Sequence, residues 1–172
     1  MILGYKRHDG RYLPLTRMSN TVDVIYPQNL DIENNVFIWH HSILECSNRI
    51  KIEEGCQIGA YVLMASHSSH MAIRLYGAHF IEYNGNHKGY VRGSIKVGKF
   101  SFVGPHSVIM PGTSIGKGSI VSAYSLVKGE FPDFAIIAGN PAVQVGDTRK
   151  TDEKLLQQYP ELREYYDEWA NS

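Results

Sequence analysis

Three histidines are the residues of this sequence whose positions suggest a chemical role. His67 and His70 lie three residues apart in the segment ASHSSHMAIR, and His106 follows in FVGPHSV. Because an imidazole ionises near pH 6.5, such a side chain can act as a general base at neutral pH, hold a metal ion, or lie at a polar surface. His67 is therefore a candidate catalytic residue, and the roles of the other two histidines stay open.

The elements that must position these histidines repeat every six residues. From Val97 an aliphatic residue returns at every sixth position without a miss, and a small residue recurs four places on. These aliphatic residues are Val97, Val103, Ile109, Ile115, Val121 and Val127. An upstream block, with a two-residue slip at 47–49, has Ile32, Ile38, Leu44, Ile52, Ile58 and Met64. A helical period near 3.6 fits less well, and a β-sandwich would place its turns roughly every 8 to 12 residues.

Each hexapeptide predicts a short extended face followed by a tight turn, with the aliphatic side chain pointing inward. Three faces close a triangular coil, so that residues three repeats apart stack one coil above another at about 4.8 Å. The predicted stacked pairs are Val97 with Ile115, Val103 with Val121, and Ile109 with Val127. The two blocks therefore predict an all-β coiled stack of about four turns.

Two segments interrupt the period. Residues 68–94 predict a long loop excursion from the coils, too aromatic for a disordered linker. It supplies candidate binding residues: His79, Glu82, Asn84, His87 and Arg92. The tail has apolar residues at helical spacing and predicts a C-terminal α-helix, with Pro160 as a break or restart. We expect residues 1–150 to form one domain and residues 151–172 to form the terminal helix.

Composition argues against several other functions. The 172 residues include 17 Lys+Arg and 17 Asp+Glu, and this balance provides no basic field for nucleic acid or anionic lipid. No apolar run approaches the ~18 residues of a membrane span, and the first residues lack a secretory signal core, so we expect a cytoplasmic protein. Cys46 and Cys56 are expected to be small buried residues in a reducing compartment.

The run IGKGSIVSAYSLVKGEFPDFAIIAGNPA, from Ile115 to Ala142, closely resembles the closing coils of the hexapeptide-repeat acyltransferases. Its AGNPA segment is a strong signature when it follows such coils. The resemblance extends over residues 20–146 and is nearest to the maltose, galactoside and polysaccharide O-acetyltransferase branch. It implies a left-handed parallel β-helix, acetyl-coenzyme A as acyl donor with no metal, and a homotrimer with active sites between neighbouring subunits.

The resemblance also assigns the catalytic position. The family's catalytic histidine lies in a Gly-His-x-x-His run just before the excursion, and His67 occupies that place here. His70 matches the second histidine, which could orient His67, contact the acceptor or line the loop. The implied acceptor contacts are His70, His79, Arg92 and His106.

Coenzyme contacts follow from two further family segments. A Trp-Ile-Gly-x-His segment matches residues 102–106, where Phe102 replaces the tryptophan and Pro105 provides no backbone N–H. A Gly-Ala-Gly-Ser turn matches residues 122–125, where bulky Tyr124 lies beside the expected pantetheine groove. The implied coenzyme-binding residues are Phe102, Gly104, Ala123, Ser125, Lys128 and Pro141.

A histidine base suits the acetyl transfer that the resemblance implies. A sugar hydroxyl is scarcely ionised at neutral pH and becomes nucleophilic once its proton is withdrawn. We assign His67 as the base in a direct transfer within a ternary complex, returning the proton to the departing thiolate. The donor to the oxyanion stays open between a coil backbone N–H and Ser125. The two core cysteines imply no covalent acyl-enzyme.

Three alternatives compete with this interpretation. An N-acetyltransferase of an amino-sugar nucleotide would use the same fold and base. A zinc carbonic-anhydrase-like trimer would use histidines such as His67, His70 and His106, although the AGNPA signature opposes it. A scaffold without catalysis is disfavoured because a histidine stands where the chemistry needs one. Residues of the upstream coils are further acceptor candidates without an alignment: Trp39, His40, His41 and Glu45.

Overall fold

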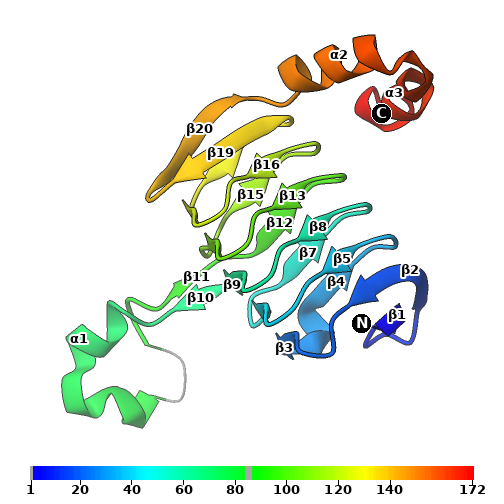
Figure 1. Ribbon diagram of the computed structural model, residues 1–172. Helices are drawn as coiled ribbons and strands as arrows, with labels where there is room; N and C mark the ends of the chain where they lie inside the picture. Colours follow the sequence, from blue (N-terminus) through cyan, green and yellow to red (C-terminus); the bar gives the residue numbers. More distant parts are fainter. Residues whose placement is uncertain (1, 84–86) are drawn as a thin grey trace.

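The computed structural model describes residues 2–83 and 87–172, and it is a stack of triangular coils with two projections (Figure 1). The chain visits three sheets in turn, which we call A, B and C. Sheet A contains β1 (Ile2–Lys6), β2 (Tyr12–Met18), β5 (Phe37–Ile38), β8 (Gln57–Ile58), β13 (Phe102–Val103), β16 (Ile120–Val121), β19 (Ala135–Gly139) and β20 (Ala142–Asp147). Sheet B contains β3 (Asp23–Ile25), β6 (Ile43–Glu45), β9 (Leu63–Ala65), β14 (Val108–Ile109) and β17 (Leu126–Val127). Sheet C contains β4 (Leu30–Ile32), β7 (Ile50–Ile52), β12 (Ile95–Val97), β15 (Ser114–Ile115) and β18 (Glu130–Phe131).

The turns between sheets form three edges along the stack, which we call corner AB, corner BC and corner CA after the sheets they join. Within the coils every strand pairs in parallel with the strand of the next coil. Antiparallel hairpins close both ends of sheet A, β1 with β2 and β19 with β20. The hairpins cover sheet edges that would otherwise be open to pairing with another chain.

The core is the column of aliphatic side chains predicted from the period. All three predicted stacks are confirmed by the strand register, including Val97 with Ile115 and Val103 with Val121. These side chains are fully buried, and each contributes about 1.5–3 kcal/mol of hydrophobic stabilisation. Across the slip, Leu44 pairs with Met64, because residues 47–49 widen corner BC by two residues without changing the register.

The stack has one coil more than the sequence predicted. Sheets B and C each contain five strands, so the prediction of about four coils was wrong. The extra coil is the first, in which Met18 and Val24 stack on Ile38 and Leu44 and Ile32, eight residues after Val24, stacks on Ile52. Its pattern is harder to recognise because the short 3-10 turn η1 (Pro27–Asn29) replaces the usual tight turn at corner BC.

Small hydroxyl residues hold the turns together. Ser107 Oγ donates to the carbonyl of Ser122 at 3.0 Å, and Ser101 Oγ donates to the carbonyl of Gly116 at 3.0 Å. Both serines are buried, so these hydrogen bonds satisfy polar groups that water cannot reach. The small residue found four places after each aliphatic residue is therefore a structural requirement of the turn.

The predicted excursion leaves the stack at corner BC and returns to the same corner, and Figure 1 shows it projecting from the coils. It contains β10 (His67–Ser68), α1 (Ala72–Tyr76), the 3-10 helix η2 (Gly77–Tyr83) and β11 (Val91–Arg92). The strands β10 and β11 pair antiparallel, with His67 opposite Arg92. The candidate Asn84 lies outside the described residues.

The C-terminal segment forms two short helices rather than one. They are α2 (Arg149–Gln158) and α3 (Arg163–Ala170), separated by the 3-10 turn η3 (Pro160–Leu162), so the break at Pro160 is found where the sequence placed it. The first helix starts two residues earlier than predicted, because the Asp147 carboxylate accepts a hydrogen bond from the Arg149 N–H at 2.9 Å. Trp169 packs against Phe100 and fixes the helices to corner CA.

Candidate active site

His67 stands at corner BC, where the third coil ends and the excursion begins, and it is paired with a carboxylate. Its Nδ1 lies 2.8 Å from Oε2 of Glu45 and 2.9 Å from Oγ of Ser47. An ionised carboxylate can only accept a hydrogen bond, so the Glu45 contact places the proton on Nδ1. Nε2 is then the nitrogen that can receive a proton from a substrate.

Glu45 is held by a closed set of hydrogen bonds. Its carboxylate accepts from the Ser47 N–H at 3.0 Å and from the Ser66 hydroxyl at 3.0 Å, and the residue is only 8% exposed. Burial by itself would raise the pKa of the Glu45 carboxyl, but hydrogen bonds from Ser47, His67 and Ser66 outweigh it and lower that pKa. The carboxylate therefore stays ionised beside the imidazole at neutral pH.

A small open pocket of about 160 Å³ surrounds the His67 ring. Tyr90 stacks on the imidazole with ring centroids 5.3 Å apart, and the Arg92 guanidinium lies 4.6 Å from the Tyr90 ring centroid. Tyr26 and Asn48 complete the lining from the two coils before it. The site thus combines a positioned imidazole with hydroxyl, amide and guanidinium groups that can bind a polar substrate.

Sequence reasoning missed the partnership of Glu45 and Ser47 with His67. Glu45 had been considered only as an acceptor candidate without an alignment. The signal was the two-residue slip: stacked residues in this part of the chain are twenty apart, as the pairing of Glu45 with Ala65 shows. Counting twenty back from His67 reaches Ser47, so a register corrected for the slip would have found this contact.

Corner AB carries the second set of predicted residues. His106 is stacked between Tyr61 and Tyr124, with ring centroids 4.9 Å apart on each side. All three have left-handed backbone φ angles near 60°, so their side chains leave the corner in register. The coenzyme candidates Phe102, Gly104 and Ala123 lie on or beside the same corner.

Within one chain, these two sets of residues do not meet. Tyr61 precedes β9 and His67 follows it, so corners AB and BC lie at opposite ends of the sheet B strands. That strand alone spans about 10 Å. Arg92 is the predicted acceptor residue that lines the His67 pocket, whereas His106 lies at the other corner.

The remaining candidates are spread more widely. Ser125 is buried, and its hydroxyl donates to the Ser122 carbonyl at 2.7 Å. The Ser125 hydroxyl proton, which was a candidate donor to the oxyanion, is therefore already used in a hydrogen bond. Lys128 is exposed at corner BC, and Pro141 is exposed in the turn between β19 and β20. His70 Nδ1 lies 2.7 Å from the Ser68 hydroxyl at the start of the excursion.

Two other excursion histidines serve the excursion itself. His79 is exposed and pairs with Glu82 at 2.9 Å. His87 is buried and stacks on Phe80 with ring centroids 3.9 Å apart. The His79 contact lies within the excursion, whereas His87 also stacks on Tyr90, with ring centroids 6.0 Å apart, and so lies behind one lining residue of the His67 pocket.

The two cysteines face the core, as predicted. Both are fully buried, and burial raises the pKa of Cys46 and of Cys56 to about 12. A thiol with such a pKa supplies almost no thiolate at neutral pH, so neither residue is equipped as a nucleophile.

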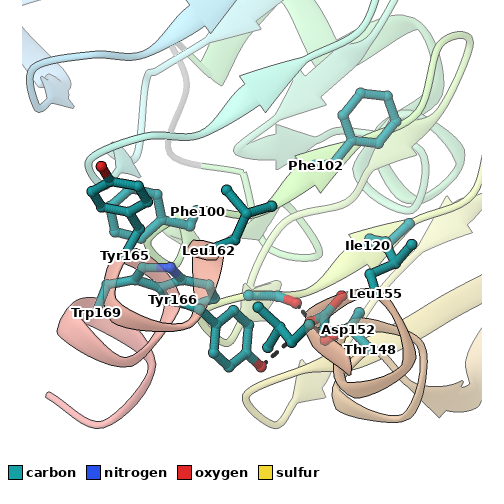
Figure 2. Close-up of a pocket in the computed structure, with 12 residues that line it drawn as sticks. Phe100, Phe102, Ile120, Thr148, Asp152, Leu155, Leu162, Tyr165, Tyr166 and Trp169 are labelled. Atoms are coloured by element: carbon teal, nitrogen blue, oxygen red, sulfur yellow. Dashed lines mark hydrogen bonds between the residues drawn. The ribbon is translucent and has the colours of Figure 1, made fainter. Parts of the chain in front are cut away.

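A larger pocket of about 480 Å³ lies between sheet A and the C-terminal helices (Figure 2). Phe102, Ile120 and Leu155 are among its mainly apolar lining residues. Its polar feature is the Tyr166 hydroxyl, 3.4 Å from Oδ2 of Asp152. The residues that line it include no histidine, whereas the pocket at corner BC contains the His67 imidazole.

The described residues contain neither a cluster of metal ligands nor a membrane-spanning helix. Over residues 2–83 and 87–172, no three side chains of the His, Cys, Asp and Glu types gather as a metal site would require. Nor does that part of the chain contain a helix long and apolar enough to cross a membrane.

The repeats match a known family of proteins. Residues 94–129 match the model described as bacterial transferase hexapeptide (six repeats), which confirms the resemblance. The chain is 35% identical to the chloramphenicol acetyltransferase of Klebsiella aerogenes over 63 residues, which is 37% of this chain and 30% of that relative. The chain thus matches about a third of that protein's length.

Solved structures show the same fold. A galactoside acetyltransferase in complex with coenzyme A superposes with a TM-score of 0.68 at 20% identity, covering 80% of this chain and 66% of that one. A maltose O-acetyltransferase from Clostridium difficile 630 superposes with a TM-score of 0.64 at 17% identity, covering 77% and 66%. The fold is therefore the left-handed parallel β-helix expected from the sequence.

Proposed function

We propose that this chain, which carries the repeats and the fold of the hexapeptide acyltransferases, is an acetyl-coenzyme A-dependent O-acetyltransferase of a sugar or polysaccharide-precursor hydroxyl. The observation that carries the proposal is the pairing of His67 Nδ1 with the Glu45 carboxylate at 2.8 Å. Such a pair orients an imidazole and stabilises the cation formed when it accepts a proton. Further support comes from relatives that are named acetyltransferases.

In this reaction, Nε2 of His67 takes the proton of the acceptor hydroxyl. At the same time the oxygen of that hydroxyl attacks the thioester carbonyl. The ester bond forms as the carbon–sulfur bond breaks, and the proton passes from the imidazole to the departing thiolate. Glu45 keeps its charge throughout and balances the transient imidazolium. The high pKa of both thiols favours this direct transfer over an acyl-enzyme.

The active site is completed, in this proposal, by a second copy of the chain within a homotrimer. Of the expected coenzyme residues, Phe102, Gly104 and Ala123 lie at or beside corner AB, whereas the proposed base lies at corner BC, so one chain supplies two separate halves. A ring of three copies closes when corner AB of each meets corner BC of the next, with sheet B facing the centre. Half-exposed side chains of sheet B, including Ile25 and Ile43, suit such an apolar centre.

The first test is calorimetric titration with acetyl-coenzyme A, after dialysis against a chelator, for the parent and for His67→Ala. The proposal expects saturable binding near one site per chain in both, and release of free thiol by the parent alone when sugars are added. Absence of binding at millimolar coenzyme contradicts it. Metal analysis of undialysed protein then tests the zinc alternative, and an amino-sugar nucleotide in the acceptor panel tests N-acetylation.

A complementation experiment tests the shared site. His67→Ala removes the base from corner BC, and Ala123→Trp fills the expected groove at the exposed turn of corner AB. Each variant alone is expected to be inactive, whereas co-expressed chains should regain about a quarter of the sites, because some interfaces pair two intact corners. No recovery in mixed oligomers would place both halves within one chain.

A further inference from the structure

The outer face of sheet A carries a slot in which Phe102 has an expected role in coenzyme binding, whereas the other lining residues have no assigned role in the proposed reaction. This slot is a partly open pocket of about 180 Å³ beside corner AB. Aromatic and small residues dominate its lining, together with a proline. The residues concerned are Phe37, Trp39 and Phe102, then Gly59 and Ala60, and finally Pro105.

The register of the coils brings the residues that line the slot together. Trp39 N donates to the Ile58 carbonyl at 3.0 Å, so Trp39 stands next to Gly59 of the next coil. A Cβ at Gly59 would lie 2.7 Å from the backbone nitrogen of Pro105, so close stacking of the coils demands glycine there. Gly59 therefore lies directly against the backbone of the coil that follows it, and Trp39, Gly59 and Pro105 all line the slot.

Two of the aromatic side chains that line the slot are largely exposed, whereas the third, Phe37, has the Arg17 guanidinium 5.0 Å from its ring centroid. Trp39 is 47% exposed and Phe102 is 41% exposed, although both are large apolar side chains. Gln57, which pairs with Phe37 and Phe102 in the strand register, is exposed between them and offers an amide donor and acceptor at the rim. Aromatic faces with a polar rim suit a ligand that is flat and apolar on its face and polar at its edge.

A pyranose ring has this character, because its C–H groups form apolar faces while its hydroxyls point outward. The volume corresponds to about six water molecules, which is space for one ring and not for a chain of them. No carboxylate or ammonium group lines the described slot, so its lining favours a neutral unit.

The slot is also connected to the candidate active site. Trp39 and His40 have ring centroids 6.0 Å apart, and the series continues through His41 and Tyr61 to His106. This run of aromatic rings leads from the slot around corner AB. In the proposed trimer, that corner faces the His67 pocket of the neighbouring copy.

We propose that the slot between Trp39 and Phe102 binds a neutral pyranose ring, and that this ring is the unit of an oligosaccharide acceptor adjacent to the unit being acetylated. The second clause rests on the proposed function, and the first does not. The acceptor is accordingly longer than a monosaccharide.

Intrinsic fluorescence provides a direct test of the first clause. The sequence has two tryptophans, and Trp169 packs at corner CA, so a Trp169→Phe variant reports from Trp39 alone. Titration with maltotriose, cellotriose and chitotriose, without coenzyme, should give a saturable change at millimolar sugar with at least one of them. A Phe102→Ala change in this background should weaken that binding about tenfold. Leu15→Ala, an exposed side chain on β2 of sheet A outside the slot, should not weaken it.

Two results overturn the first clause. One is a constant Trp39 signal with all three trisaccharides in a variant that melts like its parent. The other is a response to adenosine 3′,5′-bisphosphate that the sugars do not compete away, because the slot would then bind a nucleotide base. Neither result depends on acetyl transfer, so both are distinguishable from failure of the proposed function.

Steady-state kinetics test the second clause. Trp39→Ala should raise KM for a trisaccharide acceptor about tenfold and raise KM for the matching monosaccharide much less, and Trp39→Phe should restore much of the loss. Equal losses for both acceptors contradict the clause. If the fluorescence responds and no acceptor is acetylated, the slot stands as a sugar site and the proposed function fails.

Discussion

Corners BC and AB each carry a histidine on a coil turn, but their surroundings differ in kind. At corner BC, His67 is tied by its Nδ1 to a buried carboxylate and a serine hydroxyl. At corner AB, His106 lies exposed between two tyrosine rings with their planes within 7° of its own. One imidazole is fixed by hydrogen bonds and charge, the other by ring stacking.

This difference distinguishes a base from a binding surface. A partner at Nδ1 sets the tautomer and stabilises the protonated ring, which a general base needs. Stacking aligns a ring but does little for its proton. The position of a histidine on a coil therefore indicates little about its chemistry until its neighbours on the adjacent coils are known.

The largest contrast is expected when each histidine is removed. His67→Ala should lower acetyl transfer by about 10³-fold, because the acceptor proton then has no base. His106→Ala should lower it by less than about tenfold, since it removes a stacked ring near the groove. The rate of thiol release with a saturating acceptor measures the loss in each variant. Similar losses at the two positions would contradict the different roles assigned to His67 and His106.

The carboxylate is the next feature to change. Glu45→Gln should lower transfer by about 10²-fold while keeping the side chain's shape, because an uncharged amide neither stabilises the imidazolium nor selects its tautomer. Glu53→Gln is a matched control, being a partly buried carboxylate of sheet C that pairs with Lys51 and Lys96. Full activity in both variants would remove Glu45 from the mechanism.

The charge on Glu45 also predicts a pH dependence of stability. Hydrogen bonds hold the pKa of Glu45 below its unfolded value near 4.3, so the ionised carboxylate stabilises the fold above that pH. The stabilisation is lost as the pH falls through the lowered pKa of the folded state. Urea unfolding of the parent and of Glu45→Gln should converge in that range, and a constant difference down to low pH would contradict this account.

The smallest effect is expected from the stack at corner AB. His106→Ala removes two ring contacts and should reduce the free energy of unfolding by about 1 kcal/mol, whereas His106→Phe keeps both contacts and should reduce it less. Chemical denaturation of the two variants gives the comparison. Equal destabilisation would mean that the left-handed backbone at this position, rather than stacking, sets the cost.

Much of the fold could be predicted because one physical demand repeats. Each coil must turn its aliphatic residue inward, so period six and its stacked pairs follow from the sequence, as Val97 with Ile115 shows. The first coil was missed because η1 replaces its tight turn. The start of α2 was misplaced because a side chain, Asp147, accepts the hydrogen bond from the first helical N–H.

The candidate site was harder to predict than the fold. His67 was found from a resemblance, whereas Glu45 and Ser47 depend on a register that a two-residue slip displaces. The separation of corner AB from corner BC follows from counting strands, but the stacking of His106 between two tyrosines depends on rotamers that a sequence does not specify.

The excursion begins and ends at one point of the stack. The Gly93 N–H donates to the Ser66 carbonyl at 3.0 Å, so the coil closes behind the departing chain as though nothing had been inserted. Met64, before the excursion, still pairs with Ile109 after it. The register of the stack is thus independent of the residues inserted between Ser66 and Gly93, so the length of the inserted segment does not disturb the packing of the coils.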